Sequence, residues 1–142
     1  MLTIPRDAHI TSYRVCYADT DRMGRLYHAQ YFVLFERSRT ELLRAAGRPY
    51  ARLEEEGVFL PVRQCEARYY GSVLYDDALE LYTWVARLRR ASATFVTGVR
   101  RQRDPNVLAV GRVELACVSA EGRPRSLSPD VAKALTPFVV ED

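Results

Sequence analysis

The feature that most restricts the possible folds is a stretch at residues 29–46 whose first half is apolar on nearly every side of a helix. Its second half thins to an apolar stripe, and Gly47 and Pro49 follow it, which is typical of a helix end. A helix that is apolar nearly all round must be buried on most sides. The sequence therefore predicts one long helix at the centre of the fold. The apolar residues of its first half are Ala29, Tyr31, Phe32, Val33, Leu34 and Phe35.

A strand and a loop precede this helix. Residues 10–17 alternate, which predicts a half-buried strand with Thr11, Tyr13, Val15 and Tyr17 on one side. Residues 18–25 show no sustained apolar period and contain two carboxylates and Gly24, which predicts a loop. The order of these parts places a carboxylate loop directly against the start of the central helix.

The rest of the chain is mostly extended. Strand patterns cover residues 58–69, 79–88, 92–101 and 107–119, and residues 79–88 are apolar on both faces. Pro61 cannot donate to a ladder, so its strand is expected at an edge of the sheet or broken there. Short helices are predicted at residues 49–57 and after Ser128, with Pro129 at the first helical position. The last three strands are joined by tight turns, which makes them antiparallel neighbours. A sheet of about five strands that curls around one long helix is an α+β fold.

Composition excludes several classes of protein. A chain of 142 residues with 48% hydrophobic and 27% charged residues is expected to be a single soluble domain over residues 1–142. No apolar run approaches the roughly 20 residues that span a bilayer, and the first residues lack a signal-peptide core, so we expect a cytoplasmic protein. A net charge of +3 is too small to indicate nucleic-acid binding.

The cysteines and histidines do not indicate a metal centre. Cys16, Cys65 and Cys117 lie far apart and form no CxxC pair, so we expect buried free thiols rather than a metal or redox site. The chain has two histidines, His9 and His28, and we expect no metal and no cofactor.

The carboxylate loop suits acyl chemistry. The first N–H groups of a helix lack internal partners and carry partial positive charge, so they can polarise a carbonyl oxygen. Asp21 lies seven residues before His28, close enough for its carboxylate to face a group held at the helix start. This arrangement favours hydrolysis of an activated acyl group.

A long motif resembles a known family. Residues 17–31 read YADTDRMGRLYHAQY and residues 35–41 read FERSRTE, and LPV at 60–62, EGRPR at 121–125 and SPD at 128–130 also fit. Together they resemble the hotdog-fold acyl-CoA thioesterases, in the branch of 4-hydroxybenzoyl-CoA thioesterase and the Tol–Pal-associated thioesterases. Arg25 departs from the pattern, since the family usually has an apolar residue after the glycine.

The resemblance implies roles for individual residues. Asp21 matches the catalytic carboxylate, and the backbone N–H of His28 matches the oxyanion donor. Tyr17 and the side chain of His28 match positions that orient substrate and carboxylate, and Tyr31 is expected to contact the substrate. Gly24 is expected either to supply a positive φ or to let the backbone approach the substrate closely. The family has its site at a dimer interface, without metal or redox cofactor. We therefore expect an acyl-CoA substrate and a homodimer, possibly a homotetramer.

Basic corners of the sheet form a second expected contact with coenzyme A. Arg89 and Arg90 precede Ser92 at one corner, and Arg123 and Arg125 lie near the C-terminal turn. Their guanidinium groups suit the coenzyme A phosphates. An ordinary solvated arginine surface is an equally simple interpretation.

Other interpretations remain open for the site and for the function. Asp21 also suits a purely local role, because aspartates commonly bond loop amides, and Asp19 is expected to have only that role. The protein could bind acyl-CoA without cleaving it, or it could be a hotdog hydratase or dehydratase. That last reaction needs a histidine and a carboxylate as an acid–base pair, which His28 and Asp21 do not exclude.

Overall fold

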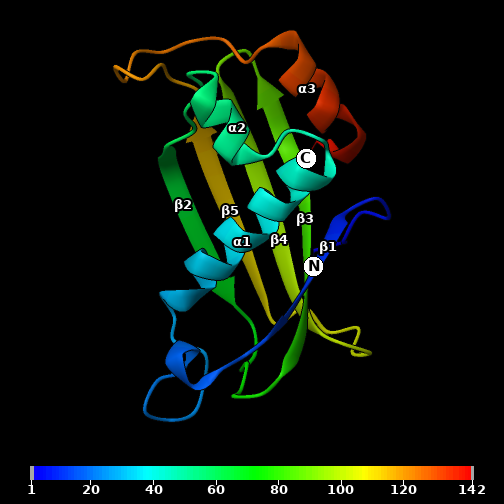
Figure 1. The fold of residues 1–142 in the computed structure, drawn as a ribbon. Coiled ribbons are helices and arrows are strands. Elements are labelled where there is room, and N and C mark those ends of the chain that lie inside the picture. Colours follow the sequence, from blue (N-terminus) through cyan, green and yellow to red (C-terminus); the bar gives the residue numbers. More distant parts are fainter. Residues whose placement is uncertain (1, 142) are drawn as a thin grey trace.

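The computed structural model describes residues 2–141 and shows a five-stranded antiparallel sheet with one long helix against one face (Figure 1). The predicted α+β fold is confirmed. The long helix α1 has 16 residues, and the other two helices are short. In chain order the elements are β1 (His9–Arg14), α1 (Gln30–Ala45), α2 (Tyr50–Glu55), β2 (Val62–Tyr69), β3 (Ala78–Arg89), β4 (Ser92–Arg101), β5 (Ala109–Ala116) and α3 (Pro129–Leu135), with 3-10 turns at Tyr17–Asp19 and Thr136–Phe138.

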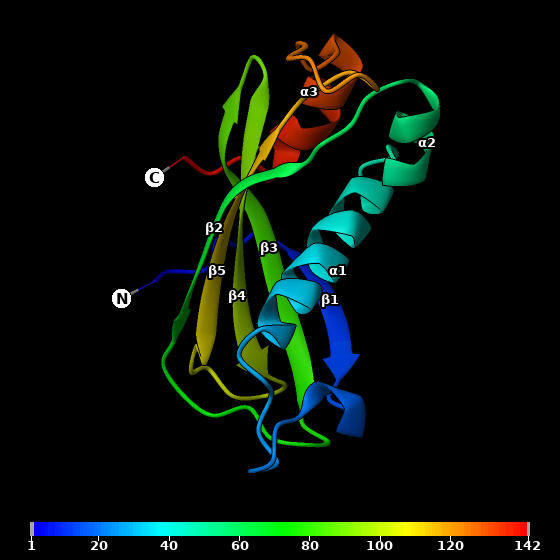
Figure 2. The same ribbon diagram turned by 90° about the vertical axis from the view of Figure 1, so that its left-hand side faces the viewer.

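The strands lie in the order β1-β3-β4-β5-β2, so β1 and β2 form the two edges of the sheet. The edge position predicted for the strand after Pro61 is thereby confirmed. Figure 2 shows that α1 covers one face of the sheet, whereas the first and last described segments of the chain extend on the other side. The start of β3 lies beside the end of β1, with Arg14 opposite Ala78. The loop that follows β1 therefore meets the connection that precedes β3.

The inner core lies between α1 and the sheet. The buried face of α1 carries Tyr31, Leu34, Phe35, Ser38, Leu42 and Leu43. Phe35 is 1% exposed, and its ring occupies the space above Gly111 of β5, where a Cβ atom would lie 2.1 Å from the ring. A side chain larger than hydrogen at position 111 would therefore push α1 away from the sheet.

A chain of buried hydroxyl groups crosses this core. The Ser38 hydroxyl donates to the Phe35 carbonyl at 2.9 Å and lies 3.2 Å from the Thr97 hydroxyl. The Thr97 hydroxyl lies 3.0 Å from that of Thr83. These groups are hydrogen-bonded to one another, as buried polar groups usually are, and they specify where α1 meets β3 and β4.

The outer face of the sheet has a smaller core. Trp84, Ala86 and Val96 are buried there, and Leu2 and Ile4 from the N-terminal segment pack against them. This second core explains why residues 79–88 are apolar on both faces.

Several local predictions were wrong. Only one face of α1 is buried in the single chain, and Val33 is 43% exposed, because the sheet covers α1 from one side. β1 ends at Arg14, so Tyr17 is not in the strand. Cys16 and Cys65 are exposed, and only Cys117 is the buried free thiol that was expected. The β4–β5 connection is also longer than a tight turn, and β5 is shorter than predicted. No helix within residues 2–141 is long and apolar enough to cross a bilayer.

Candidate active site

The loop between β1 and α1 is attached to the segment that follows β2. The Leu26 N–H donates to the Val73 carbonyl at 2.8 Å, and the Tyr75 N–H donates to the Gly24 carbonyl at 3.0 Å. Thr20 and Leu26 form an antiparallel bridge that closes the loop on itself. Gly24 has a φ of +74°, a conformation that glycine adopts without strain, as the sequence predicted. The loop is therefore held by backbone bonds from both sides.

Asp19 is the internal anchor of this loop, and its side chain is 3% exposed. One carboxylate oxygen accepts from the Tyr13 hydroxyl at 2.6 Å and from the Cys16 N–H at 2.9 Å, and the other accepts from the Gln30 amide at 3.0 Å. Burial by itself raises the pKa of Asp19, but the hydrogen bonds from Tyr13 and Cys16 outweigh burial and hold the pKa below its usual value. Asp19 thus ties β1, the loop and the start of α1 together, in agreement with the structural role predicted for it.

Asp21 is exposed, and one of its carboxylate oxygens is used by the loop. Its Oδ1 accepts from the Met23 N–H at 2.8 Å and from the Arg25 N–H at 3.2 Å. The Asp21 N–H donates to the Arg25 carbonyl at 2.7 Å. Among residues 2–141, no hydrogen-bond donor contacts Oδ2. The local role considered for Asp21 is therefore present, and it leaves one oxygen available for chemistry.

The start of α1 follows directly. Gln30 is its first residue, and its N–H donates to the Tyr27 carbonyl at 2.8 Å. Ala29 occupies the N-cap position, where its methyl side chain cannot accept a hydrogen bond. Within the described residues, the N–H of His28 donates to no backbone carbonyl. The helix start therefore offers an uncommitted donor in the segment that follows the Asp21 loop.

A contact that the sequence did not reveal lies on the other side of His28. The Tyr69 hydroxyl, at the end of β2, donates to the His28 carbonyl at 2.9 Å. The ring of Tyr69 also packs edge-on against Tyr31, with ring centroids 4.8 Å apart. No periodicity or motif links residues so far apart in the sequence, so only the folded chain could show this contact.

The two remaining aromatic candidates are placed differently from each other. Tyr17 is 77% exposed in its 3-10 turn, and its ring stacks on Tyr75 at a centroid distance of 4.2 Å. Tyr31 is 4% exposed and belongs to the core, where burial raises its pKa to about 12. In the single chain, Tyr17 is thus accessible to solvent beside the loop, whereas Tyr31 is buried in the core in the first turn of α1.

The basic corners meet each other but lie far from Asp21. The Arg90 guanidinium donates to the Ser126 hydroxyl at 2.9 Å, and that of Arg125 donates to the Gly57 carbonyl at 3.0 Å. Arg89 and Arg123 are exposed in the same region, and Ser92 is buried there at the start of β4. Figure 1 shows this region at the end of the sheet opposite the Asp21 loop. The 16 residues of α1, about 24 Å at the usual rise, separate the two ends.

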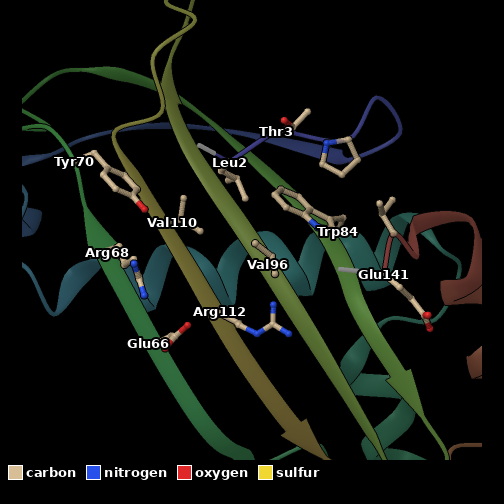
Figure 3. Close-up of a pocket in the computed structure, with 12 residues that line it drawn as sticks. Leu2, Thr3, Glu66, Arg68, Tyr70, Trp84, Val96, Val110, Arg112 and Glu141 are labelled. Atoms are coloured by element: carbon tan, nitrogen blue, oxygen red, sulfur yellow. The ribbon is translucent and has the colours of Figure 1, made fainter.

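A hollow of about 520 Å³ lies elsewhere, on the outer face of the sheet (Figure 3). Trp84, Val96 and Val110 form its apolar floor, and Arg68 and Arg112 project at its rim. None of the loop residues 17–28 lines it. Within residues 2–141, no three His, Cys, Asp or Glu side chains gather as a metal site. The candidate active site is therefore the loop and the helix start.

Comparison with known proteins shows the family of the chain. The model of the thioesterase-like superfamily matches residues 15–135. The acyl-CoA thioester hydrolase YbgC of Escherichia coli is 34% identical over 119 residues, which cover 83% of this chain and 88% of that protein. The acyl-CoA thioesterase YbgC of Haemophilus influenzae is 36% identical over 74% of this chain and 76% of its own length. The DHNA-CoA thioesterase of Staphylococcus aureus has a similar structure, with a TM-score of 0.84, 28% identity and coverage of 89% of this chain and 87% of that one. The chain belongs to the thioesterase-like superfamily.

Proposed function

We propose that this protein is an acyl-CoA thioesterase, which uses water to convert R–CO–S–CoA into a free acid and coenzyme A. The observation that carries the proposal is that one short segment of chain contains two groups free for chemistry. Asp21 keeps one carboxylate oxygen uncommitted, in a loop that leads directly into the uncommitted N–H of His28 at the start of α1. The family membership and the 34% identity to the E. coli acyl-CoA thioester hydrolase support the same reaction.

In the proposed mechanism, the thioester carbonyl oxygen accepts a hydrogen bond from the His28 N–H. The positive end of the helix stabilises the negative charge that develops on this oxygen in the transition state. Asp21 either attacks the carbonyl carbon or removes a proton from an attacking water. Both routes consume one water, break the C–S bond and release the thiol. Tyr17 and the His28 side chain are proposed to orient the substrate and the carboxylate, and no cofactor is required.

The distance between the two ends of the sheet suggests how coenzyme A is held. Within one chain, the Asp21 loop and the arginines lie at opposite ends of the sheet, separated by the length of α1. A two-fold, antiparallel pairing of two copies through the edge strand β2 would bring the basic corner of the partner towards the Asp21 loop. We therefore propose that the working unit is a homodimer or a larger assembly of dimers, with the arginines on the coenzyme A phosphates.

A direct test measures release of free thiol from a panel of acyl-CoA esters with a thiol-reactive chromophore. A thioesterase releases one thiol for each ester consumed. Ligand binding without thiol release, or conversion of the acyl group with the thioester intact, would contradict the proposal and favour a binding protein or a hydratase.

The role of Asp21 is tested by Asp21→Asn. Asparagine keeps an Oδ1 acceptor for the two loop amides, so the loop is preserved and only the negative charge is lost. We expect kcat to fall by about 10²-fold or more with little change in substrate binding. Asp76→Asn is the matched control: this exposed aspartate lies next to the loop and has a φ of 69°, a conformation that asparagine tolerates. The assignment fails if Asp21→Asn retains more than half of the wild-type kcat.

A further inference from the structure

We propose that Tyr69 is a positioning residue, whose hydroxyl holds the His28–Ala29 peptide and thereby aims the donor group at the start of α1. The inference rests on the proposed function, because that function gives the helix start its chemical role. It adds a residue from the edge strand β2 to a site otherwise built from the loop and α1.

The contact itself is well defined. The Tyr69 hydroxyl donates to the His28 carbonyl oxygen at 2.9 Å. The backbone of Tyr69 is fixed, because Tyr69 pairs in the ladder with Ala109 of β5, which is fully buried. The ring is fixed as well, by its edge-on contact with the buried ring of Tyr31 at 4.8 Å. The hydroxyl is therefore presented to His28 from a rigid support.

The start of α1 needs such a support. The N-cap residue, Ala29, makes no side-chain hydrogen bond, whereas serine, threonine, aspartate or asparagine at that position would stabilise the first turn. On the loop side, the Tyr27 N–H donates to the Asp19 carbonyl at 2.9 Å, and the Gln30 side chain donates to the Asp19 carboxylate. Asp19 thus holds the residues that flank the His28–Ala29 peptide, and Tyr69 holds the peptide carbonyl itself.

A hydrogen bond at this carbonyl affects the proposed chemistry through geometry. The His28 N–H belongs to the Tyr27–His28 peptide, whose carbonyl accepts from the Gln30 N–H at 2.8 Å. The Tyr69 hydroxyl fixes the following peptide plane, so both planes that meet at the His28 Cα are held, and with them the direction of the His28 N–H. Reacting groups are sensitive to such placement, since a misplacement of about 1 Å can reduce a rate by about 100-fold.

The phenol is suited to this role over a wide pH range. Burial raises the pKa of Tyr69 above its usual value, so the hydroxyl keeps its proton and remains a donor at neutral and mildly alkaline pH.

The test is Tyr69→Phe, which keeps the ring contact with Tyr31 and removes only the hydroxyl. The matched control is Tyr70→Phe, because Tyr70 is the next residue, is 62% exposed and lines the hollow on the outer face of the sheet. With an acyl-CoA substrate, we expect Tyr69→Phe to lower kcat by about 3- to 30-fold, less than the loss of an oxyanion donor itself. KM should stay within about twofold and Tyr70→Phe should match the wild type, because only transition-state placement is affected.

A second measurement does not depend on activity. Amide hydrogen exchange of residues 27–31, followed by mass spectrometry, should be faster in Tyr69→Phe than in the wild type and unchanged in Tyr70→Phe. Unchanged exchange in Tyr69→Phe would overturn the inference, whether or not the wild type is active. Absence of thioesterase activity in the wild type would by itself refute only the proposed function. Full kcat in Tyr69→Phe, or a kcat loss matched by an equal rise in KM and a large fall in melting temperature, would overturn it as well.

Discussion

Replacing Gly111 by alanine tests how α1 is seated on the sheet. A Cβ atom at this position would lie 2.1 Å from Cε2 of Phe35 and 2.4 Å from Cδ2 and Cζ. Carbon atoms normally approach to about 3.5–4.0 Å, so the ring would have to move by more than about 1 Å. Phe35 is 1% exposed, and its ring is also packed edge-on against Phe32, so the ring cannot move without displacing its neighbours.

The expected cost follows from two opposing effects. Overpacking a closely packed core typically costs 1–3 kcal/mol, and this overlap is severe enough to lie at the upper end of that range. Replacing a strand glycine by alanine returns about 0.5–1 kcal/mol, because glycine loses more conformational freedom on folding. We therefore expect the free energy of unfolding to fall by about 2 kcal/mol. Urea unfolding at a fixed protein concentration measures this quantity.

Gly98→Ala is the matched control, and Phe35→Leu provides a rescue. Gly98 lies in β4, opposite the residue that precedes Gly111. Its added Cβ would meet the side chains of Ile4 at 3.4 Å and Leu2 at 3.6 Å, which is close to ordinary contact. We expect Gly98→Ala to stay within about 0.5 kcal/mol of the wild type. The loss of unfolding free energy in the double variant Gly111→Ala/Phe35→Leu should be smaller, by about 1 kcal/mol or more, than the sum of the losses in the two single variants, because the smaller side chain relieves the overlap. Equal stability of Gly111→Ala and Gly98→Ala would refute the reasoning.

Three further predictions concern pH, assembly and substrate. Because the pKa of Asp19 is lowered in the folded protein, its charge contributes stability above the unfolded pKa of about 3.9, and this stability is lost as the pH falls through the folded pKa. Asp19→Asn should therefore lower the free energy of unfolding by about 1–3 kcal/mol at pH 7 and by progressively less towards pH 3. A stability difference that does not depend on pH would contradict this. Light scattering at micromolar concentration should give at least twice the chain mass, whereas a value near 16.3 kDa would exclude the dimer. The Arg89→Ala/Arg123→Ala variant leaves the structural bonds of Arg90 and Arg125 intact. It should raise KM for an acyl-CoA but not for the acyl-pantetheine analogue, and kcat should be unchanged. An equal rise in KM for both substrates would exclude phosphate binding by these arginines.

The sequence by itself determined those features that depend on neighbours a few residues apart. The apolar period of residues 29–46 predicted α1, and the turn at Gly24 predicted a positive φ, because both depend on local backbone geometry. Pro61 predicted that its strand is either broken there or lies at an edge of the sheet, and β2, which begins at Val62, is an edge strand. The loop with Asp19 and Asp21 before the helix start was also local, so the proposed catalytic groups could be named from the motif.

Only the tertiary structure decided which distant residues meet these groups. The strand order β1-β3-β4-β5-β2 places the end of β2 beside the helix start, which brings Tyr69 to His28 across 41 positions of sequence. The antiparallel directions of the strands put the arginine corners at the end of the sheet opposite the Asp21 loop. The depth to which α1 packs depends on Phe35 meeting a glycine in β5. Such contacts depend on the order of the strands in the sheet. Short-range periodicity shows which face of a helix or strand is buried, but it does not show which helix or strand packs beside it.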